Sequence, residues 1–296
     1  MACFSFILTE VCDWNCGYCQ FPLLKKQNQL TTDKIIRNVP YIRDIVSKTA
    51  EIQPPYMEIQ GGEVGLIGEH TLALFLEELD YPVNVSTNGL FLERGYHLNH
   101  RIRPYVKEVQ WHLCDRPGDY KLNLDYNDNN IFINKGIVHD NVDEIAAFIS
   151  RNPHIQFNYV ELECDIQSKR SPHTEDYTRL YKEIKSMGNV SENALEILEG
   201  RAYSPEDKRD KCKNYHSVVS INMASETICL CQRATNVNIP LTRENLIKRL
   251  NTFPCKLFNY PDEIVGCDSC IRLFSGKYEF FPREILKLRR LDFNES

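Results

Sequence analysis

Three cysteines lie close together near the start of the chain, in the segment VCDWNCGYCQ at residues 11–20. Cys12, Cys16 and Cys19 follow a C-x3-C-x2-C pattern, so they fit within one short loop. A disulfide framework uses cysteines in pairs, and a closed zinc site takes four ligands. Three clustered thiols therefore indicate a metal centre that keeps one coordination position open for a further ligand.

Length, charge and hydropathy limit the kind of protein that holds this centre. The chain has 296 residues, of which 42% are hydrophobic, which suits a large domain with or without a smaller one. A net charge of −6 and the absence of a long basic run disfavour a nucleic-acid partner. The apolar run CFSFIL is too short for a secretory signal or a membrane span, so we expect no membrane partner. The chain has twelve cysteines, and in the reducing cytoplasm, where we place the protein, we expect thiols in such number to include metal ligands rather than disulfides.

Extended apolar segments alternate with helical patterns over the first half of the chain. The strands are expected at 3–11, 55–60, 82–89, 106–114, 130–138 and 155–163, and the helices at about 32–50, 70–79, 140–152 and 174–187. This alternation predicts an α/β fold with parallel strands and helices outside them. The link at 115–130 carries turn residues without a helical pattern, which breaks the alternation there.

The character of the sequence changes near residue 204. Cysteines and two short strands at 217–223 and 227–231, which we expect to form a hairpin, replace the alternation, and no long helix is expected before the final residues. We therefore predict a large domain at 1–203, a small cysteine-rich domain at 204–275 and a terminal helix at 276–296.

The cysteine motif resembles that of the radical S-adenosylmethionine (radical SAM) superfamily. It follows the first strand, and the aromatic Tyr18 stands directly before the last cysteine. Two further segments occur in the order typical of that family: QGGE at 60–63 after the second strand and STNG at 86–89 at the end of the third. QGGE and STNG are each a common turn signal when taken alone. Together with the cysteine motif they extend the resemblance over residues 4 to 165.

The resemblance implies a partial (β/α)6 TIM-like barrel and a particular chemistry. Cys12, Cys16 and Cys19 would hold a [4Fe-4S] cluster whose fourth iron binds the amino and carboxylate groups of S-adenosylmethionine (AdoMet). An electron from a donor such as flavodoxin or ferredoxin would then cleave AdoMet to a 5′-deoxyadenosyl radical. The expected AdoMet-binding residues are Tyr18, Gly61, Gly62, Glu63, Ser86 and Asn88.

The second cysteine group resembles the auxiliary-cluster extensions called SPASM and twitch domains, the single-cluster twitch form most closely. The resemblance implies a second [4Fe-4S] cluster in a β-hairpin and helix arrangement. The expected ligands are Cys212, Cys229, Cys267 and Cys270, with Cys231 and Cys255 as alternative ligands. A structural zinc ribbon is the alternative, because the CDSC turn suits zinc as well.

Candidate substrate-contacting residues lie at the carboxyl ends of the later strands, which face the active site in barrels. They are His112, Glu161 and Glu163, with Cys114 as a possible hydrogen-atom donor or else a structural cysteine. The expected reaction is oxidation or crosslinking of a peptide through abstraction of hydrogen from a C–H bond. The alternatives are a dehydrogenase or epimerase of a small sugar or aminocyclitol, and a non-catalytic iron–sulfur or zinc binding module.

Overall fold

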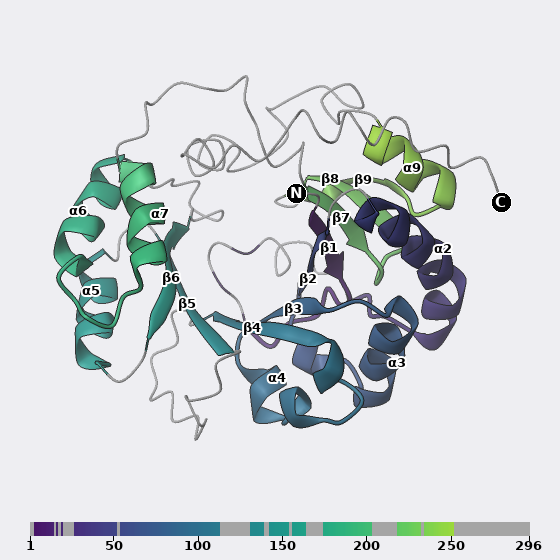
Figure 1. Cartoon of the computed structure of the whole chain (residues 1–296), viewed down its shortest axis with the longest axis horizontal. Helices are drawn as coiled ribbons and strands as arrows, with labels where there is room; N and C mark the ends of the chain where they lie inside the picture. Colours follow the sequence, from purple (N-terminus) through teal and green to yellow (C-terminus); the bar gives the residue numbers. More distant parts are fainter. Residues whose placement is uncertain are drawn as a thin grey trace.

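The computed structural model shows an α/β protein built on one mixed sheet (Figure 1). It describes residues 3–14, 16, 19, 27–51, 54–112, 131–138, 142–153, 156–163, 174–202, 218–231 and 234–251. Within these residues the sheet has nine strands in the order β6-β5-β4-β3-β2-β1-β7-β8-β9.

The first six strands are parallel and neighbour one another in chain order. They are β1 (Cys3–Ile7), β2 (Tyr56–Gln60), β3 (Val83–Thr87), β4 (Val106–His112), β5 (Ile131–Val138) and β6 (Phe157–Glu163). The helices are α2 (Thr32–Ala50), α3 (Glu69–Leu79), α4 (Leu90–Glu93), α5 (Val142–Arg151), α6 (Thr174–Ile184) and α7 (Glu192–Ala202), with short 3-10 turns at η1 (Val64–Leu66), η2 (Tyr96–Leu98) and η3 (Arg103–Tyr105).

This arrangement confirms the predicted alternation, to which α7 adds a helix that the sequence did not predict. Figure 1 shows the strands following an arc with the helices on its outer side. Because β6 and β9 form the two edges of the described sheet, closure into a partial barrel stays a prediction.

Alternating side chains along the strands separate the two faces of the sheet. On β1, Phe4 and Phe6 are fully buried on the helix side, where the ring of Phe6 meets Phe75 of α3 edge to face at 5.5 Å. The helix α2 begins at the cap Thr31, whose side chain accepts from the backbone N–H of Lys34, and it continues through Pro40. The apolar residues of this outer layer form one core. The inner face of the sheet therefore carries side chains that do not belong to this core.

The C-terminal strands continue the same sheet. Strand β7 (Val218–Asn222) pairs in parallel with β1, and β8 (Thr227–Cys231) and β9 (Ala234–Pro240) follow in antiparallel order. The predicted hairpin is confirmed. The sequence analysis did not identify the short helix α9 (Arg243–Asn251), which buries Leu246 and Leu250 and packs on α2. The predicted domain boundaries at 203/204 and 275/276, and the terminal helix at 276–296, lie outside the described residues.

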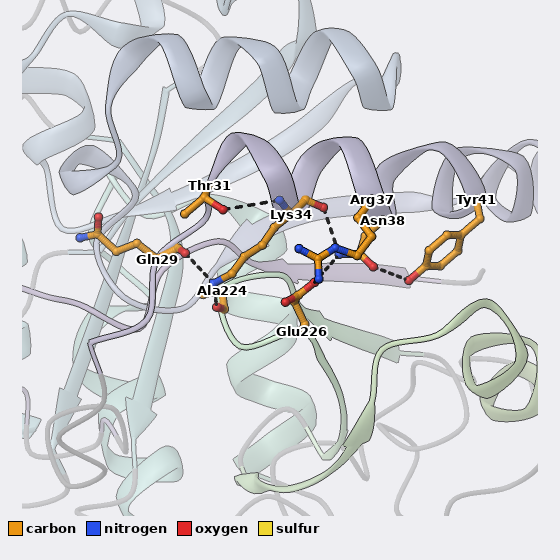
Figure 2. Close-up of polar contacts among 8 residues, drawn as sticks. All are labelled: Gln29, Thr31, Lys34, Arg37, Asn38, Tyr41, Ala224 and Glu226. Carbon is orange, nitrogen blue, oxygen red and sulfur yellow. Dashed lines mark hydrogen bonds and ion pairs between the residues drawn. The ribbon is translucent and has the colours of Figure 1, made fainter.

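A set of polar contacts fastens the turn between β7 and β8 to α2 (Figure 2). The ammonium of Lys34 donates to the carbonyls of Gln29, at 3.0 Å, and Ala224. The amide of Asn38, a residue only 2% exposed, donates at 2.9 Å to the carboxylate of Glu226. Arg37 lies 3.5 Å from the same carboxylate. The C-terminal hairpin is therefore held to the N-terminal layer by side chains as well as by backbone pairing.

The described part of the chain contains no helix with both the length and the apolar character that a membrane span requires.

We expect Asn38→Ala to lower the free energy of unfolding by about 1–3 kcal/mol, because it removes a buried amide and leaves its partly buried partners unsatisfied. Those partners include the hydroxyl of Tyr41, which donates to Asn38 Oδ1 at 2.8 Å. Arg37→Ala is the control and should cost less than about 1 kcal/mol, since Arg37 is 62% exposed. Urea unfolding of the wild type and the two variants measures both changes in the free energy of unfolding. Equal decreases in the two variants would contradict this account.

Candidate active site

A cavity of about 200 Å³ lies at the carboxyl ends of β1 to β4. Its wall contains all three cysteines of the first loop and most of the residues predicted to bind AdoMet. The lining residues are Ile7, Cys12, Trp14, Cys16, Cys19, Gln60, Gly61, Gly62, Glu63, Ser86, Thr87, Asn88 and His112. The structure therefore brings the C-x3-C-x2-C, GGE and TNG segments to one place, as the sequence predicts, and adds His112 to them.

The turn after β2 is fastened to the residues that lead into the cysteine loop. The N–H of Gly62 donates to the carbonyl of Thr9, and that of Glu63 donates to the carbonyl of Val11, both at 2.8 Å. A Cβ atom on Gly62 would lie 2.1 Å from the Val11 carbonyl oxygen, so no other residue fits. Gly61 adopts a φ of +123°, which side chains disfavour. Both glycines are required by this close approach of two backbones.

The carboxylate of Glu63 joins the turn after β2 to the turn after β3. Oε1 accepts from the N–H of Gly65 at 2.8 Å and from the hydroxyl of Thr87 at 2.7 Å. Oε2 accepts from the N–H of Asn88 at 2.7 Å. Burial raises the pKa of Glu63 above its usual value, and the three donated hydrogen bonds act in the opposite sense. Glu63 thus holds the cavity wall together, and its predicted contact with AdoMet stays a prediction.

Asn88 connects the turn after β3 to the cysteine loop and to β4. Its side-chain Nδ2 donates to the carboxylate of Asp13 at 2.7 Å, and its backbone carbonyl accepts from the indole of Trp111 at 3.2 Å. Asp13 and Trp111 were not identified from the sequence, because neither belongs to a recurring pattern. The first contact holds the cysteine loop to the turn after β3, and the second holds that turn to β4.

The environment of the cysteines suits a cationic centre. Burial raises the pKa of Cys12 to about 11, so its thiolate needs a nearby positive charge, which iron supplies. No three His, Cys, Asp or Glu side chains of the described residues converge closely enough for one metal ion. Cys12, Cys16 and Cys19 instead line one cavity, and an iron–sulfur cluster would bind their thiolates through different irons.

Glu10 is a buried residue that positions the cysteine loop and that the sequence analysis did not identify. Its carboxylate is 2% exposed and accepts from the amides of Asn28, at 2.6 Å, and Asn222 of β7, at 2.7 Å. Asn222 Oδ1 accepts from the N–H of Ser225 at 3.0 Å, which fixes the orientation of that amide. The N–H of Glu10 also donates to the carbonyl of Asn28 at 2.9 Å. One buried carboxylate therefore joins both ends of the cysteine loop to the C-terminal strands.

Of the other predicted site residues, some lie within the described part of the chain and the rest lie outside it. Cys229 is 1% exposed and packs with Ile7 and Cys19, beside the first cysteine loop. Cys231 ends β8, and on β6 Glu161 and Glu163 are in register with Gly136 and Val138. Outside the described residues lie Tyr18, Cys114, Cys212, Cys255, Cys267 and Cys270.

Solved structures share this fold at low sequence identity. SuiB of Streptococcus suis bound to S-adenosylmethionine aligns with a TM-score of 0.51 and 13% identity, over 90% of this chain and 67% of that one. Native anSMEcpe with bound AdoMet aligns with a TM-score of 0.59 and 12% identity, over 86% of this chain and 82% of that one. The same protein with AdoMet and the Cp18Cys peptide aligns with a TM-score of 0.55 and 11% identity, over 90% of this chain and 88% of that one. No protein-family model matches the sequence, and comparison with curated proteins gives no match.

All of these structures hold AdoMet, the ligand that the predicted resemblance implies. The chain therefore shares its fold with AdoMet-bound proteins, and the radical SAM resemblance predicted from its cysteine motif is confirmed at the level of the fold.

We expect Glu10→Ala to lower the free energy of unfolding by about 1–3 kcal/mol, because it leaves the buried amide of Asn222 without an acceptor. The cysteine loop loses its tie to β7, so the variant should also retain less iron per chain after anaerobic reconstitution. Glu10→Gln is the matched control, since its carbonyl still accepts from Asn222 and the exposed Asn28 can turn over to pair with its amide. An alanine variant with the iron content and the stability of the wild type would contradict the proposed connection between the cysteine loop and β7 through Glu10.

Proposed function

We propose that this protein is a radical SAM enzyme that reductively cleaves AdoMet and abstracts hydrogen from a substrate C–H bond. The observation that carries the proposal is the meeting of the three cysteines with the turns after β2 and β3 around one cavity. A three-thiolate [4Fe-4S] cluster supplies an iron that AdoMet can bind and an electron that cleaves its sulfonium bond.

Each part of the chain has a distinct task in this proposal. Cys12, Cys16 and Cys19 hold the cluster. The turn at Gly61, Gly62 and Glu63 would offer backbone groups to the methionine end of AdoMet, and Ser86 and Asn88 line the same cavity. Tyr18 would complete the site. The buried network of Glu63 keeps the two turns in place while AdoMet enters, so the site is formed before the cofactor binds.

The substrate proposed first is a peptide, which the enzyme oxidises or crosslinks. The structure of anSMEcpe with the Cp18Cys peptide shows that this fold accommodates a peptide in that protein. A sugar or aminocyclitol dehydrogenase or epimerase is the alternative, and a non-catalytic metal-binding module is the third. His112 lines the cavity and is a candidate substrate contact, as are Glu161 and Glu163. In an epimerase Cys114 would return a hydrogen atom to the substrate radical.

The second cysteine group is proposed to hold an auxiliary [4Fe-4S] cluster through Cys212, Cys229, Cys267 and Cys270, with Cys231 and Cys255 as alternative ligands. Such a cluster would accept an electron from the substrate radical, which favours net oxidation. Cys229 stands on the strand next to β7 and contacts the first loop through Cys19, so a cluster that used it would lie near the active site. A flavodoxin or ferredoxin of the reducing cytoplasm would supply the electrons.

The anaerobically reconstituted protein should convert AdoMet to methionine and 5′-deoxyadenosine when dithionite is added. Changing Cys12, Cys16 and Cys19 together to Ala should abolish both products, because the thiolates that hold the cluster are gone. Cys3→Ala on β1 is the control and should retain cleavage. Chromatography of both products measures the outcome. Cleavage of AdoMet by the triple variant would contradict the proposed role of the cysteine loop. If the wild type does not cleave AdoMet, the interpretation as an enzyme fails and the non-catalytic binding module is favoured.

Iron analysis and absorption spectroscopy test the auxiliary cluster separately. We expect about eight irons per chain in the wild type, and about four in the double variant Cys267→Ala with Cys270→Ala. The double variant should still cleave AdoMet, since the first cluster is untouched. About four irons together with bound zinc in the wild type would contradict the auxiliary cluster and favour the zinc ribbon.

A further inference from the structure

The side-chain amide of Asn88 lies between two groups of the cysteine loop. Its Nδ2 donates to Oδ1 of the Asp13 carboxylate at 2.7 Å and lies 3.9 Å from Cys12 Sγ, within reach of an N–H···S hydrogen bond. A primary amide carries two N–H hydrogens, so it can donate to the carboxylate and to the sulfur at the same time. A residue of the turn after β3 is therefore directed at one of the three predicted cluster ligands.

The orientation of this amide is fixed by the turn to which Asn88 belongs. Its side-chain Oδ1 accepts from the backbone N–H of Leu90 at 3.2 Å, which leaves Nδ2 on the side of the cysteine loop. The backbone N–H of Asn88 donates to the buried carboxylate of Glu63 at 2.7 Å, and its backbone carbonyl accepts from the Trp111 indole at 3.2 Å. The donor is thus held in place by residues other than the cysteines.

Cys12 Sγ also receives an N–H from its own loop. The backbone N–H of Trp14 donates to this sulfur at 3.5 Å. Hydrogen bonds to the sulfurs of an iron–sulfur cluster stabilise the extra negative charge of its reduced form, so they raise its reduction potential. A side-chain substitution can remove the Asn88 donor but not the Trp14 donor, which belongs to the backbone.

The carboxylate of Asp13 acts on the same sulfur in the opposite sense. Its Oδ1 lies 4.0 Å from Cys12 Sγ, at a distance where the thiol S–H can donate to it. Once the sulfur binds iron that proton is gone, and a carboxylate then faces a thiolate. An electron added to the cluster meets the repulsion of this carboxylate, although water screens part of it because Asp13 is exposed.

We propose that Asn88 and Asp13 are a pair of positioning residues that sets the reduction potential of the N-terminal cluster through Cys12. Asn88 raises the potential through its N–H donor, and Asp13 lowers it through its charge. The step concerned is the one-electron reduction of the cluster by the external donor, in which no bond forms or breaks. The inference rests on the proposed function, since this cluster would pass the electron to AdoMet.

A redox titration followed by electron paramagnetic resonance measures this potential directly. The full-length protein, Asn88→Ala and Asp13→Asn are reconstituted anaerobically without AdoMet. All three carry Cys267→Ala and Cys270→Ala, which removes the signal of the proposed auxiliary cluster. We expect Asn88→Ala to lower the equilibrium constant for reduction about tenfold, equivalent to about 59 mV for one electron. Asp13→Asn should shift the potential in the opposite direction and by less, because that side chain is exposed.

Asp80→Asn is the matched control for the loss of one negative charge. Asp80 is the C-cap of α3, ahead of the first residue of β3, whereas Asn88 follows the carboxyl end of that strand. Its φ of +54° is one that Asn tolerates, so the substitution keeps the local backbone. This variant should have the potential of the unsubstituted protein.

An exchange variant separates the effect on the potential from a purely structural role. In Asp13→Asn combined with Asn88→Asp, an amide on the loop still donates to a carboxylate on the turn, so the two stay connected. The position next to Cys12 Sγ then offers a carboxylate oxygen in place of an N–H donor. We expect the iron content of the unsubstituted protein together with a lower reduction potential.

The outcomes separate this inference from the proposed function. Shifts of Asn88→Ala and Asp13→Asn in the same direction, or no shift in either, would overturn the inference. An unshifted exchange variant would overturn it as well, and that variant decides if Asn88→Ala retains no cluster. AdoMet cleavage is then measured in the same samples. Cleavage with unshifted potentials contradicts only the role of the pair, whereas opposite shifts without cleavage contradict only the proposed function.

Discussion

Two backbone hydrogen bonds, from Gly62 to Thr9 and from Glu63 to Val11, hold the candidate active site together. They bring the turn after β2 against the residues that lead into the cysteine loop, at a distance that excludes a side chain on Gly62. The carboxylate of Glu63 then extends the same connection to the turn after β3. Three loops from separate strands therefore form one unit, and the orientation of the cysteines depends on it.

The C-terminal strands belong to this unit as well. Strand β7 pairs with β1 along its whole length, and Asn222 at its end bonds to the buried carboxylate of Glu10. The contacts between α2 and the β7–β8 turn fasten the same hairpin from the outer side. A change in the C-terminal part can thus reach the cysteine loop through two residues. This coupling gives a physical reason why a second metal centre in that part would affect the first.

The sequence predicted the local features and missed those that depend on distant partners. Periodicity located β1 to β6 and most of their helices, and the glycine turns marked the cavity wall because their residue types have few other uses. The pairing of β7 with β1 joins residues more than 200 positions apart, which no local pattern encodes. Glu10 looked like an ordinary polar residue, since only its neighbours in space show that it is buried. Helix α9 was missed because its apolar residues are few and its pattern is short.

The central claim is that one iron of the N-terminal cluster lacks a protein ligand and binds AdoMet. Electron–nuclear double resonance on the reduced protein tests it most directly, with AdoMet carrying a magnetic nitrogen isotope at its amino group. The account predicts a hyperfine coupling between the cluster and that nitrogen, lost when the three loop cysteines are replaced. A reduced cluster whose spectrum is unchanged by AdoMet and shows no such coupling would contradict it.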